Sequence, residues 1–228
     1  DWSSDVCSSD LKGKLIVSCQ ALPEEPLHSS FIMGRMALAA QQGGASGIRA
    51  QGVEDIQEIM KVVDLPVIGI IKRNYDDSSI YITPTKKEVN ELLQTKCQMI
   101  AIDATDRKRP NDETIQELLD LIHQGGRLAM ADISTYEEAV NAEKLGFDVI
   151  STTLCGYTSY STNYEGPNLE LIGQLVQDLH IPVIAEGKIN NPEDLKAVLN
   201  AGAFSAVVGG AITRPQLITK KFVSILND

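Results

Sequence analysis

The strongest constraint on the fold is a regular alternation between short apolar runs and longer amphipathic segments, which begins at Lys12 and continues to the end of the chain. Val, Ile and Leu fill each run almost without interruption, a pattern typical of strands that are covered on both faces of a parallel sheet. Eight such runs are present, at residues 15–19, 47–49, 66–71, 99–103, 127–132, 148–152, 182–186 and 206–209.

Helix signals separate these runs. Capping residues and early prolines precede several amphipathic segments, at Thr83-Pro84-Thr85, Asn111-Asp112-Glu113, Ser134-Thr135 and Asn191-Pro192-Glu193. Glycines follow several of them, at Gly43-Gly44, Gly125-Gly126, Gly146 and Gly202. An open doubly wound sheet would accept this alternation, but eight strand–helix units in about 215 residues close naturally into a (β/α)8 TIM barrel, a parallel eight-stranded closed barrel. No linker divides residues 12–228, so we expect one domain.

The first eleven residues do not share this pattern. Residues 1–11 are rich in Ser and Asp, and they lack the basic start and apolar middle of a secretion signal. We interpret residues 1–11 as a non-native segment or a disordered tail and exclude them from the expected barrel.

Composition narrows the classes of ligand and location. A formal net charge of -11 argues against binding nucleic acid or an anionic membrane through a broad surface, and no apolar run approaches the roughly 20 residues that cross a bilayer. The four cysteines form no C-x-x-C pair and only three histidines are present. We therefore expect free thiols, a cytoplasmic location and no metal site. An anionic ligand would need a local cluster of cations and backbone amides.

Charged residues end five of the apolar runs. In a barrel, the C-terminal ends of the strands meet at one rim and carry the active site. The five residues are Arg49, Lys72, Asp103, Asp132 and Glu186. We expect the cations Arg49 and Arg73 to favour the neutral amine of Lys72. Glu186 or Asp132 would oppose that change.

Lys72 and Glu186 are the candidate catalytic pair. Lys72 could be a Schiff-base nucleophile, a general base or a phosphate clamp, and Glu186 suits two-base proton chemistry. Alternatively, Glu186 forms a buried salt bridge with Lys72 or Lys188. Asp132 either orients a substrate hydroxyl or holds Lys72. Asp103 either contacts substrate at the rim or braces the loop that follows it, which contains two arginines.

The last two strands supply a candidate phosphate site. Gly187 follows one strand, and Gly209 and Gly210 follow the next, where bare backbone N–H groups can approach an anion closely. Arg214 begins the final helix, with Pro215 at its first turn, and an arginine can bind phosphate through two parallel hydrogen bonds. The loops after the last two strands are where such barrels commonly bind phosphate.

Long motifs carry a resemblance to a known family. They read VSCQALPEEPLHSSFIMGRMALAA, GIRAQG, PVIGIIKRNYDDSSIYITPT, AIDATDRKRP, GRLAMADIST, DVISTTLCGYT, IPVIAEGKIN and VVGGAITRP. Over essentially all of residues 12–228, the chain resembles the N-acetylmannosamine-6-phosphate 2-epimerases of bacterial sialic acid catabolism.

The resemblance implies interconversion of N-acetylmannosamine 6-phosphate and N-acetylglucosamine 6-phosphate by proton transfer at C2, without a cofactor. Lys72 then matches the base and Glu186 the acid, with roles exchanged in reverse, while Asp132 matches a residue that orients substrate and lysine. Gln20 and Arg49 match substrate contacts. Gly187, Gly209, Gly210 and Arg214 match the residues that contact the phosphate. The resemblance also suggests a homodimer.

Two other classes of function remain open from the residues. One is a different phosphate-binding barrel enzyme, either similar to ribulose-phosphate 3-epimerase or a Schiff-base aldolase using Lys72. The other is a catalytically silent barrel that senses a sugar phosphate, which could lose Lys72 or Glu186 but would keep the phosphate contacts.

Overall fold

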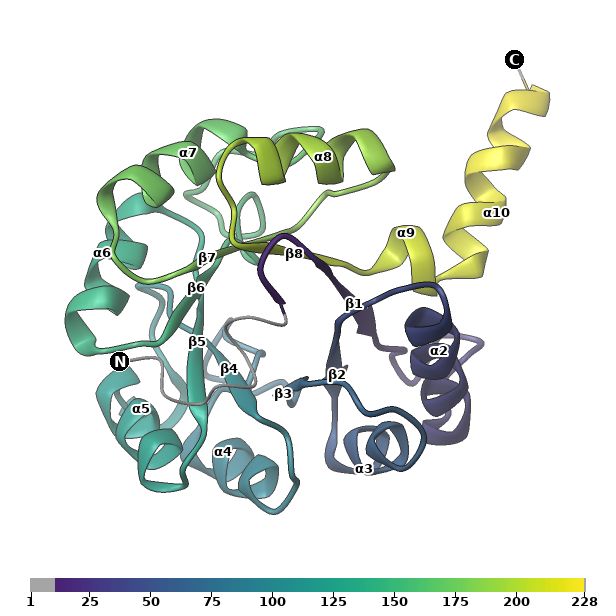
Figure 1. The fold of residues 1–228 in the computed structure, drawn as a ribbon. Coiled ribbons are helices and arrows are strands. Elements are labelled where there is room, and N and C mark those ends of the chain that lie inside the picture. Colours follow the sequence, from purple (N-terminus) through teal and green to yellow (C-terminus); the bar gives the residue numbers. More distant parts are fainter. Residues whose placement is uncertain (1–10, 228) are drawn as a thin grey trace.

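The computed structural model describes residues 11–227 and contains a closed barrel of eight parallel strands surrounded by helices (Figure 1). The strands are β1 (Leu15–Cys19), β2 (Gly47–Gln51), β3 (Val67–Ile70), β4 (Met99–Asp103), β5 (Leu128–Asp132), β6 (Val149–Ser151), β7 (Val183–Glu186) and β8 (Ser205–Val208). The predicted (β/α)8 barrel is confirmed, and each predicted strand is present with ends that differ by at most two residues.

The helices alternate with the strands around the outside. They are α2 (Ser30–Gln42), α3 (Val53–Val62), α4 (Lys86–Leu93), α5 (Ile115–Gln124), α6 (Tyr136–Leu145), α7 (Leu169–Asp178), α8 (Pro192–Asn200), α9 (Gly210–Thr213) and α10 (Pro215–Ser224), with 3-10 turns at Pro110–Asp112 and Ile225–Asn227. No helix in the described part of the chain is both long and apolar enough to span a membrane.

Pairing between the first and last strands closes the sheet. Val17 of β1 lies opposite Ile48 of β2 and also opposite Val208 of β8. Successive side chains of a strand point to opposite faces, so the closed sheet has an inner and an outer core. On β4, Met99 belongs to the inner apolar cluster, whereas Ile100 belongs to the outer cluster between the strands and the helices.

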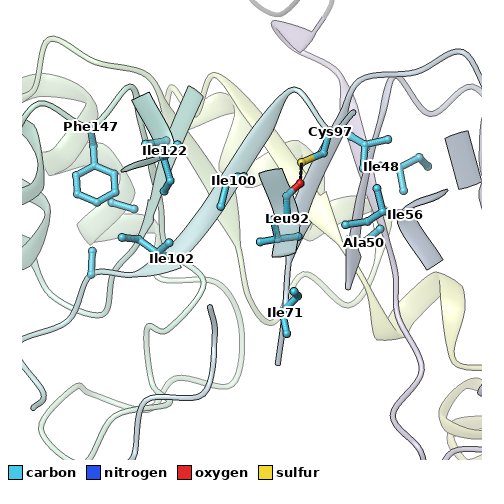
Figure 2. Packing of buried hydrophobic residues seen from close by; sticks show 14 of the residues in the cluster. Ile48, Ala50, Ile56, Ile71, Leu92, Cys97, Ile100, Ile102, Ile122 and Phe147 are labelled. Atoms are coloured by element: carbon cyan, nitrogen blue, oxygen red, sulfur yellow. Dashed lines mark hydrogen bonds between the residues drawn. The ribbon is translucent and has the colours of Figure 1, made fainter. Parts of the chain in front are cut away.

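The outer core fixes the helices against the barrel. Figure 2 shows Ile100 and Ile102 of β4 in the same cluster as Leu92 of α4 and Ile122 of α5. These side chains are fully buried, and burying a Leu or Ile side chain stabilises a fold by about 1.5–3 kcal/mol. The packing holds the strand ends, and therefore the rim, in one arrangement.

Most predicted helix starts are confirmed, but one is wrong. Thr85 and Thr135 cap α4 and α6, and Asn191 caps α8. Asn111-Asp112-Glu113 does not start α5, because Asn111 (φ 57°) and Asp112 (φ 54°) adopt left-handed backbone angles that cannot continue a right-handed helix. Thr114 caps α5 instead, in a capping box with Glu117.

Leu11 belongs to the barrel, although the sequence placed it in the excluded segment. It is 3% exposed and packs in the inner apolar cluster with Ile16. A Cβ added to Gly47 would lie 3.0 Å from its Cδ2, so Leu11 packs closely on the start of β2. The exclusion of residues 1–10 concerns residues outside the described part of the chain and stays a prediction.

Helix α10 differs from the helices that cover the strands. It extends outward from the barrel, with the C-terminus at its far end (Figure 1). None of its residues is buried, and Phe222 is 72% exposed. The predicted start of this helix is confirmed, since Arg214 is its N-cap and Pro215 its first residue.

Candidate active site

A cavity of about 890 Å³ opens at the C-terminal ends of the strands. Eight residues predicted from the sequence line it, namely Gln20, Arg49, Lys72, Glu186, Gly187, Gly209, Gly210 and Arg214. The charged side chains of the lining are five cations, Arg49, Lys72, Lys188, Arg214 and Lys221, and one carboxylate, Glu186. An acidic protein thus presents a locally cationic cavity, which favours an anionic ligand.

Arg49 and two carboxylates form a buried network in the barrel. Ile48 and Ala50 pack in the outer core, so strand alternation turns Arg49 inward, where it is 1% exposed. Its Nη1 and Nη2 donate to Oδ1 and Oδ2 of Asp132 at 3.0 and 2.6 Å. Its Nη1 also lies 3.0 Å from Oε2 of Glu186. The guanidinium therefore balances both carboxylates where unpaired charge would be costly.

Asp132 contacts Arg49, which lines the cavity, but does not line the cavity itself. It is fully buried, and its carboxylate accepts from Arg49 and from Thr153. No hydrogen bond or ion pair joins it to Lys72 within residues 11–227. Of the two roles left open by the sequence, the structure supports neither direct substrate contact nor contact with Lys72. Asp132 is placed to orient Arg49.

Glu186 ends β7 with its carboxyl at the cavity. Burial raises its pKa, Arg49 lowers it, and the charge of Asp132 raises it again, with a net rise from the ordinary value. Thr152 fixes the backbone, because its Oγ1 donates to O of Glu186 at 2.9 Å and accepts from N at 3.0 Å. A raised pKa favours the protonated carboxyl, which is the form that a general acid needs.

Lys72 presents an amine whose pKa is lowered to about 8, by burial first and then by the charges of Arg49 and Arg214. Glu186 and Glu25 oppose that change. No hydrogen bond or ion pair occupies its Nζ in the described chain. A lysine in this state can act as a general base at a pH slightly above neutrality.

Arg73 does not act on Lys72 as predicted. Its guanidinium pairs with Glu88 and, at 3.0 Å between Nη2 and Oε2, with Glu91 of α4. The predicted contribution of Arg73 is therefore wrong, and Arg214 takes that place. Adjacent residues of an extended chain point in opposite directions, which separates Lys72 from Arg73.

Asp103 braces a loop. Its carboxylate accepts from Oγ1 of Thr105 at 2.7 Å and pairs with Arg107, while Arg109 donates to its backbone oxygen. It is fully buried and does not line the cavity. The predicted contact of Asp103 with substrate is not supported, because its carboxylate is occupied within its own loop.

Arg214 is held by a residue that the sequence did not single out. Glu25, in the loop after β1, accepts from Nε and Nη2 of Arg214 at 2.6 and 3.0 Å and also from Gln216. Within residues 11–227, no hydrogen bond or ion pair engages Nη1 of Arg214, which can therefore contact a ligand. Glu25 is one of two adjacent glutamates in the segment Pro23–Pro26, and nothing in the sequence distinguishes it from Glu24.

Thr153, Tyr81 and Tyr157 also line the cavity and were not predicted. Oγ1 of Thr153 lies within hydrogen-bonding distance of both Asp132 and Glu186. Tyr157 lies near Lys188, whose Nζ is 5.5 Å from the ring centroid. Hydroxyl residues at strand ends are common, so their spacing alone did not point to this site.

One solved structure shares both the fold and most of the sequence, and another shares the fold. The structure of the N-acetylmannosamine-6-phosphate 2-epimerase from Clostridium perfringens matches with a TM-score of 0.93 and 68% identity, covering 95% of this chain and 94% of that chain. The thiamine phosphate pyrophosphorylase from Pyrococcus furiosus matches with a TM-score of 0.59 at 20% identity and covers 88% and 87% of the two chains. This second likeness concerns the fold alone.

Curated sequences agree with the first of these structures. A putative N-acetylmannosamine-6-phosphate 2-epimerase from Clostridium perfringens (strain SM101 / Type A) is 68% identical over 216 residues, covering 95% of this chain and 98% of the relative. One from Staphylococcus aureus (strain Newman) is 54% identical over 219 residues, covering 94% and 98%. The family model described as putative N-acetylmannosamine-6-phosphate epimerase matches residues 33–228. The cationic cavity and these matches together show that the chain belongs to the N-acetylmannosamine-6-phosphate epimerase family.

Proposed function

We propose that this protein is an isomerase that interconverts N-acetylmannosamine 6-phosphate and N-acetylglucosamine 6-phosphate in amino sugar and sialic acid catabolism. The observation that carries the proposal is a pair of groups with opposed proton affinities on one cavity. Lys72 has a lowered pKa, of about 8, and Glu186 has a raised one. Such a pair suits an amine that takes a proton and a carboxyl that returns one.

The reaction proceeds through the open-chain sugar, in which C2 is adjacent to the C1 aldehyde. Neutral Lys72 takes the C2 proton, and the electron pair of the C–H bond moves into the C1–C2 bond while the aldehyde oxygen becomes an enolate oxyanion. Arg49 and the newly charged Lys72 stabilise that oxyanion. Glu186 then gives its proton to the opposite face of C2, the aldehyde reforms, and the configuration is inverted. In the reverse direction the two roles exchange.

The 6-phosphate anchors the substrate at a fixed distance from C2. The candidate donors are the backbone N–H groups around Gly209 and Gly210 and the Nη1 of Arg214, and Gly187 adds an unhindered backbone beside Glu186. Gln20 also lines the cavity and can contact the sugar. The cationic lining supports a phosphorylated substrate over a neutral sugar.

Deuterium exchange tests the reaction. With N-acetylmannosamine 6-phosphate in deuterated water, we expect NMR to show the gluco epimer with deuterium at C2. Lys72→Met should abolish both epimerisation and exchange, whereas the matched variant Lys61→Met, at a side chain 69% exposed on α3, should retain them. Epimerisation with no deuterium incorporation would contradict this solvent-exchanging route.

Borohydride trapping and the turnover assay separate these rival functions. A Schiff-base aldolase would form an adduct of Lys72 that borohydride traps, and our proposal expects no such adduct. A sensor would bind the sugar phosphate without any turnover. Either result, obtained with wild-type protein, would overturn the epimerase proposal.

We also propose that the protein is a homodimer, in which the outward helix α10 packs against a second copy. Phe222, Ile225 and Leu226 are 72%, 71% and 82% exposed, which is unusual for large apolar side chains so close together. A twofold dimer would bury the same face of both copies. Light scattering should give twice the chain mass of 24.8 kDa. Phe222→Glu should shift the measured mass towards that of the monomer, whereas the control Lys220→Glu should not. A monomeric wild-type protein at micromolar concentration would refute the dimer.

A cytoplasmic location completes the proposal. Cys19, Cys97 and Cys155 carry free thiols, as expected in a reducing compartment. Cys7 lies outside the described residues. Cell fractionation of the native host checks the location, and recovery of the protein in the extracellular fraction would contradict it.

A further inference from the structure

One hydroxyl lies between the two carboxylates that Arg49 joins. Thr153 follows β6, and its Oγ1 is 2.7 Å from Oδ1 of Asp132 and 3.1 Å from Oε2 of Glu186. A threonine hydroxyl has a single hydrogen, so it can donate to only one of these carboxylates at a time. At any moment, Thr153 therefore donates its hydrogen bond either to Asp132 or to Glu186.

The two carboxylates have different roles in the proposed reaction, because only Glu186 transfers a proton. Asp132 is fully buried, accepts two hydrogen bonds from Arg49 and takes no proton from the substrate in the proposed reaction. Glu186 lines the cavity and exchanges a proton with C2 in every turnover. Only the acceptor strength of Glu186 changes during the reaction.

We propose that Thr153 is a positioning residue that switches its hydrogen bond between Asp132 and Glu186 as Glu186 gains and loses its proton; this inference rests on the proposed epimerase function. When Glu186 is ionised, Thr153 donates to it and stabilises the charge. When Glu186 is protonated, the Thr153 hydroxyl turns to Asp132. The switch needs rotation about the Cβ–Oγ1 bond alone, so the carboxyl of Glu186 keeps its place relative to C2 in both states.

Ser151 supports both states of the switch. Its Oγ lies 2.8 Å from Oγ1 of Thr153 and 3.4 Å from Oε2 of Glu186. Ser151 can therefore donate to Oγ1 of Thr153 whether Thr153 donates to Asp132 or to Glu186. Hydrogen bonds in such a chain strengthen one another in a buried setting.

Three other groups act on the proton affinity of Glu186. Arg49 faces it from β2, Asp132 from β5, and Lys72 from the segment after β3. Replacing Thr153 removes none of these charges. A change in the titration of Glu186 in such a variant therefore reports the loss of the hydroxyl.

The decisive pair of variants is Thr153→Val and Thr152→Val. Valine keeps the shape of threonine and removes its hydroxyl. Thr152 is the matched control, because its hydroxyl contacts the backbone of Glu186 and not the carboxyl. The readout is the titration of the Glu186 carboxyl by carbon-13 NMR of glutamate-labelled protein, assigned with Glu186→Gln. This readout needs no turnover.

In the switch, Thr153→Val removes a hydrogen bond from ionised Glu186 and, when Glu186 is protonated, one from Asp132, so the titration of Glu186 reports the difference between the two. Asp132 already accepts two hydrogen bonds from Arg49, which makes the bond to Glu186 the stronger. We therefore expect Thr153→Val to move the titration of Glu186 up by about half a pH unit.

Thr153→Ser should restore the wild-type titration, and Thr152→Val should leave it in place. Thr153→Ala gives the same test if the valine variant does not fold. An unshifted titration in Thr153→Val, or an equal shift in Thr152→Val, would overturn the switch. If wild-type protein does not epimerise the substrate, the proposed function fails, whatever the titration shows.

Discussion

Replacing Lys72 with methionine should make the protein inactive and more stable at neutral pH. Methionine removes the amine that takes the C2 proton but keeps a flexible apolar stem. The amine has a pKa of about 8, against an ordinary value of 10.5, because burial and the charges of Arg49 and Arg214 disfavour its protonated form. The charged amine of Lys72 therefore lowers the free energy of unfolding of the wild-type protein, and the methionine variant does not have this destabilisation.

The size of this effect follows from the pKa. Each pH unit corresponds to about 1.4 kcal/mol, so a fall from 10.5 to about 8 makes charged Lys72 cost about 3 kcal/mol in the folded state. Below pH 8 the amine is charged in both states, and the full cost is present. Between pH 8 and 10.5 the unfolded chain binds a proton that the folded protein does not, so wild-type stability rises with pH. Above 10.5 the cost is gone.

Urea unfolding of both proteins measures this difference. At pH 7, Lys72→Met should be more stable by about 2–3 kcal/mol, which for a chain of this size is a rise in Tm of roughly 5–10 °C. At pH 10 most of that gain should be lost. The control Lys61→Met, on the surface, should change stability by less than about 0.5 kcal/mol at either pH. A variant that is no more stable at pH 7, or one whose gain is equal at both values, would refute the reasoning.

Two further predictions concern the candidate phosphate site and the inner apolar core of the barrel. Arg214→Ala should raise KM for the phosphorylated substrate about 100-fold and change kcat much less, because the phosphate is remote from the reacting carbon; steady-state kinetics would contradict this if kcat fell and KM did not change. Leu11→Ala should lower the free energy of unfolding by about 2–5 kcal/mol, because Leu11 is 3% exposed in the inner core. A urea midpoint equal to that of wild type would show that Leu11 lies outside the fold.

The position of the site could be predicted from the sequence because it depends on local pattern. Lys72 and Glu186 each follow an apolar run, and the ends of parallel strands meet at one rim in any closed barrel. Gly209, Gly210 and Arg214 follow from the same reasoning for the last strand. Eight predicted residues indeed line the cavity. Their chemical roles, by contrast, stay predictions until the variants are measured.

The partners of these residues could not be predicted, since they lie far apart in the chain. Asp132 is 83 residues from Arg49, and Glu25 is 189 residues from Arg214. No local pattern marks which of several acids meets a given cation. The same applies to Arg73, which pairs with Glu91 of α4. Asp103 is the opposite case, because its partner Arg107 is four residues away and the bracing of this loop was one of the two roles that the sequence indicated.

The sequence by itself determined the order of strands and helices, the barrel, and the residues that reach its rim, because hydrophobic periodicity and capping act within a few residues. Tertiary structure alone decided that Leu11 closes the inner core, that Arg49 joins Asp132 and Glu186, and that Thr153 lies between them. These outcomes depend on distances across the closed sheet. Once the barrel closes, buried charges pair with the side chains that the opposite strands present. Burial first, and then these neighbouring charges, set the proton affinities of Lys72 and Glu186.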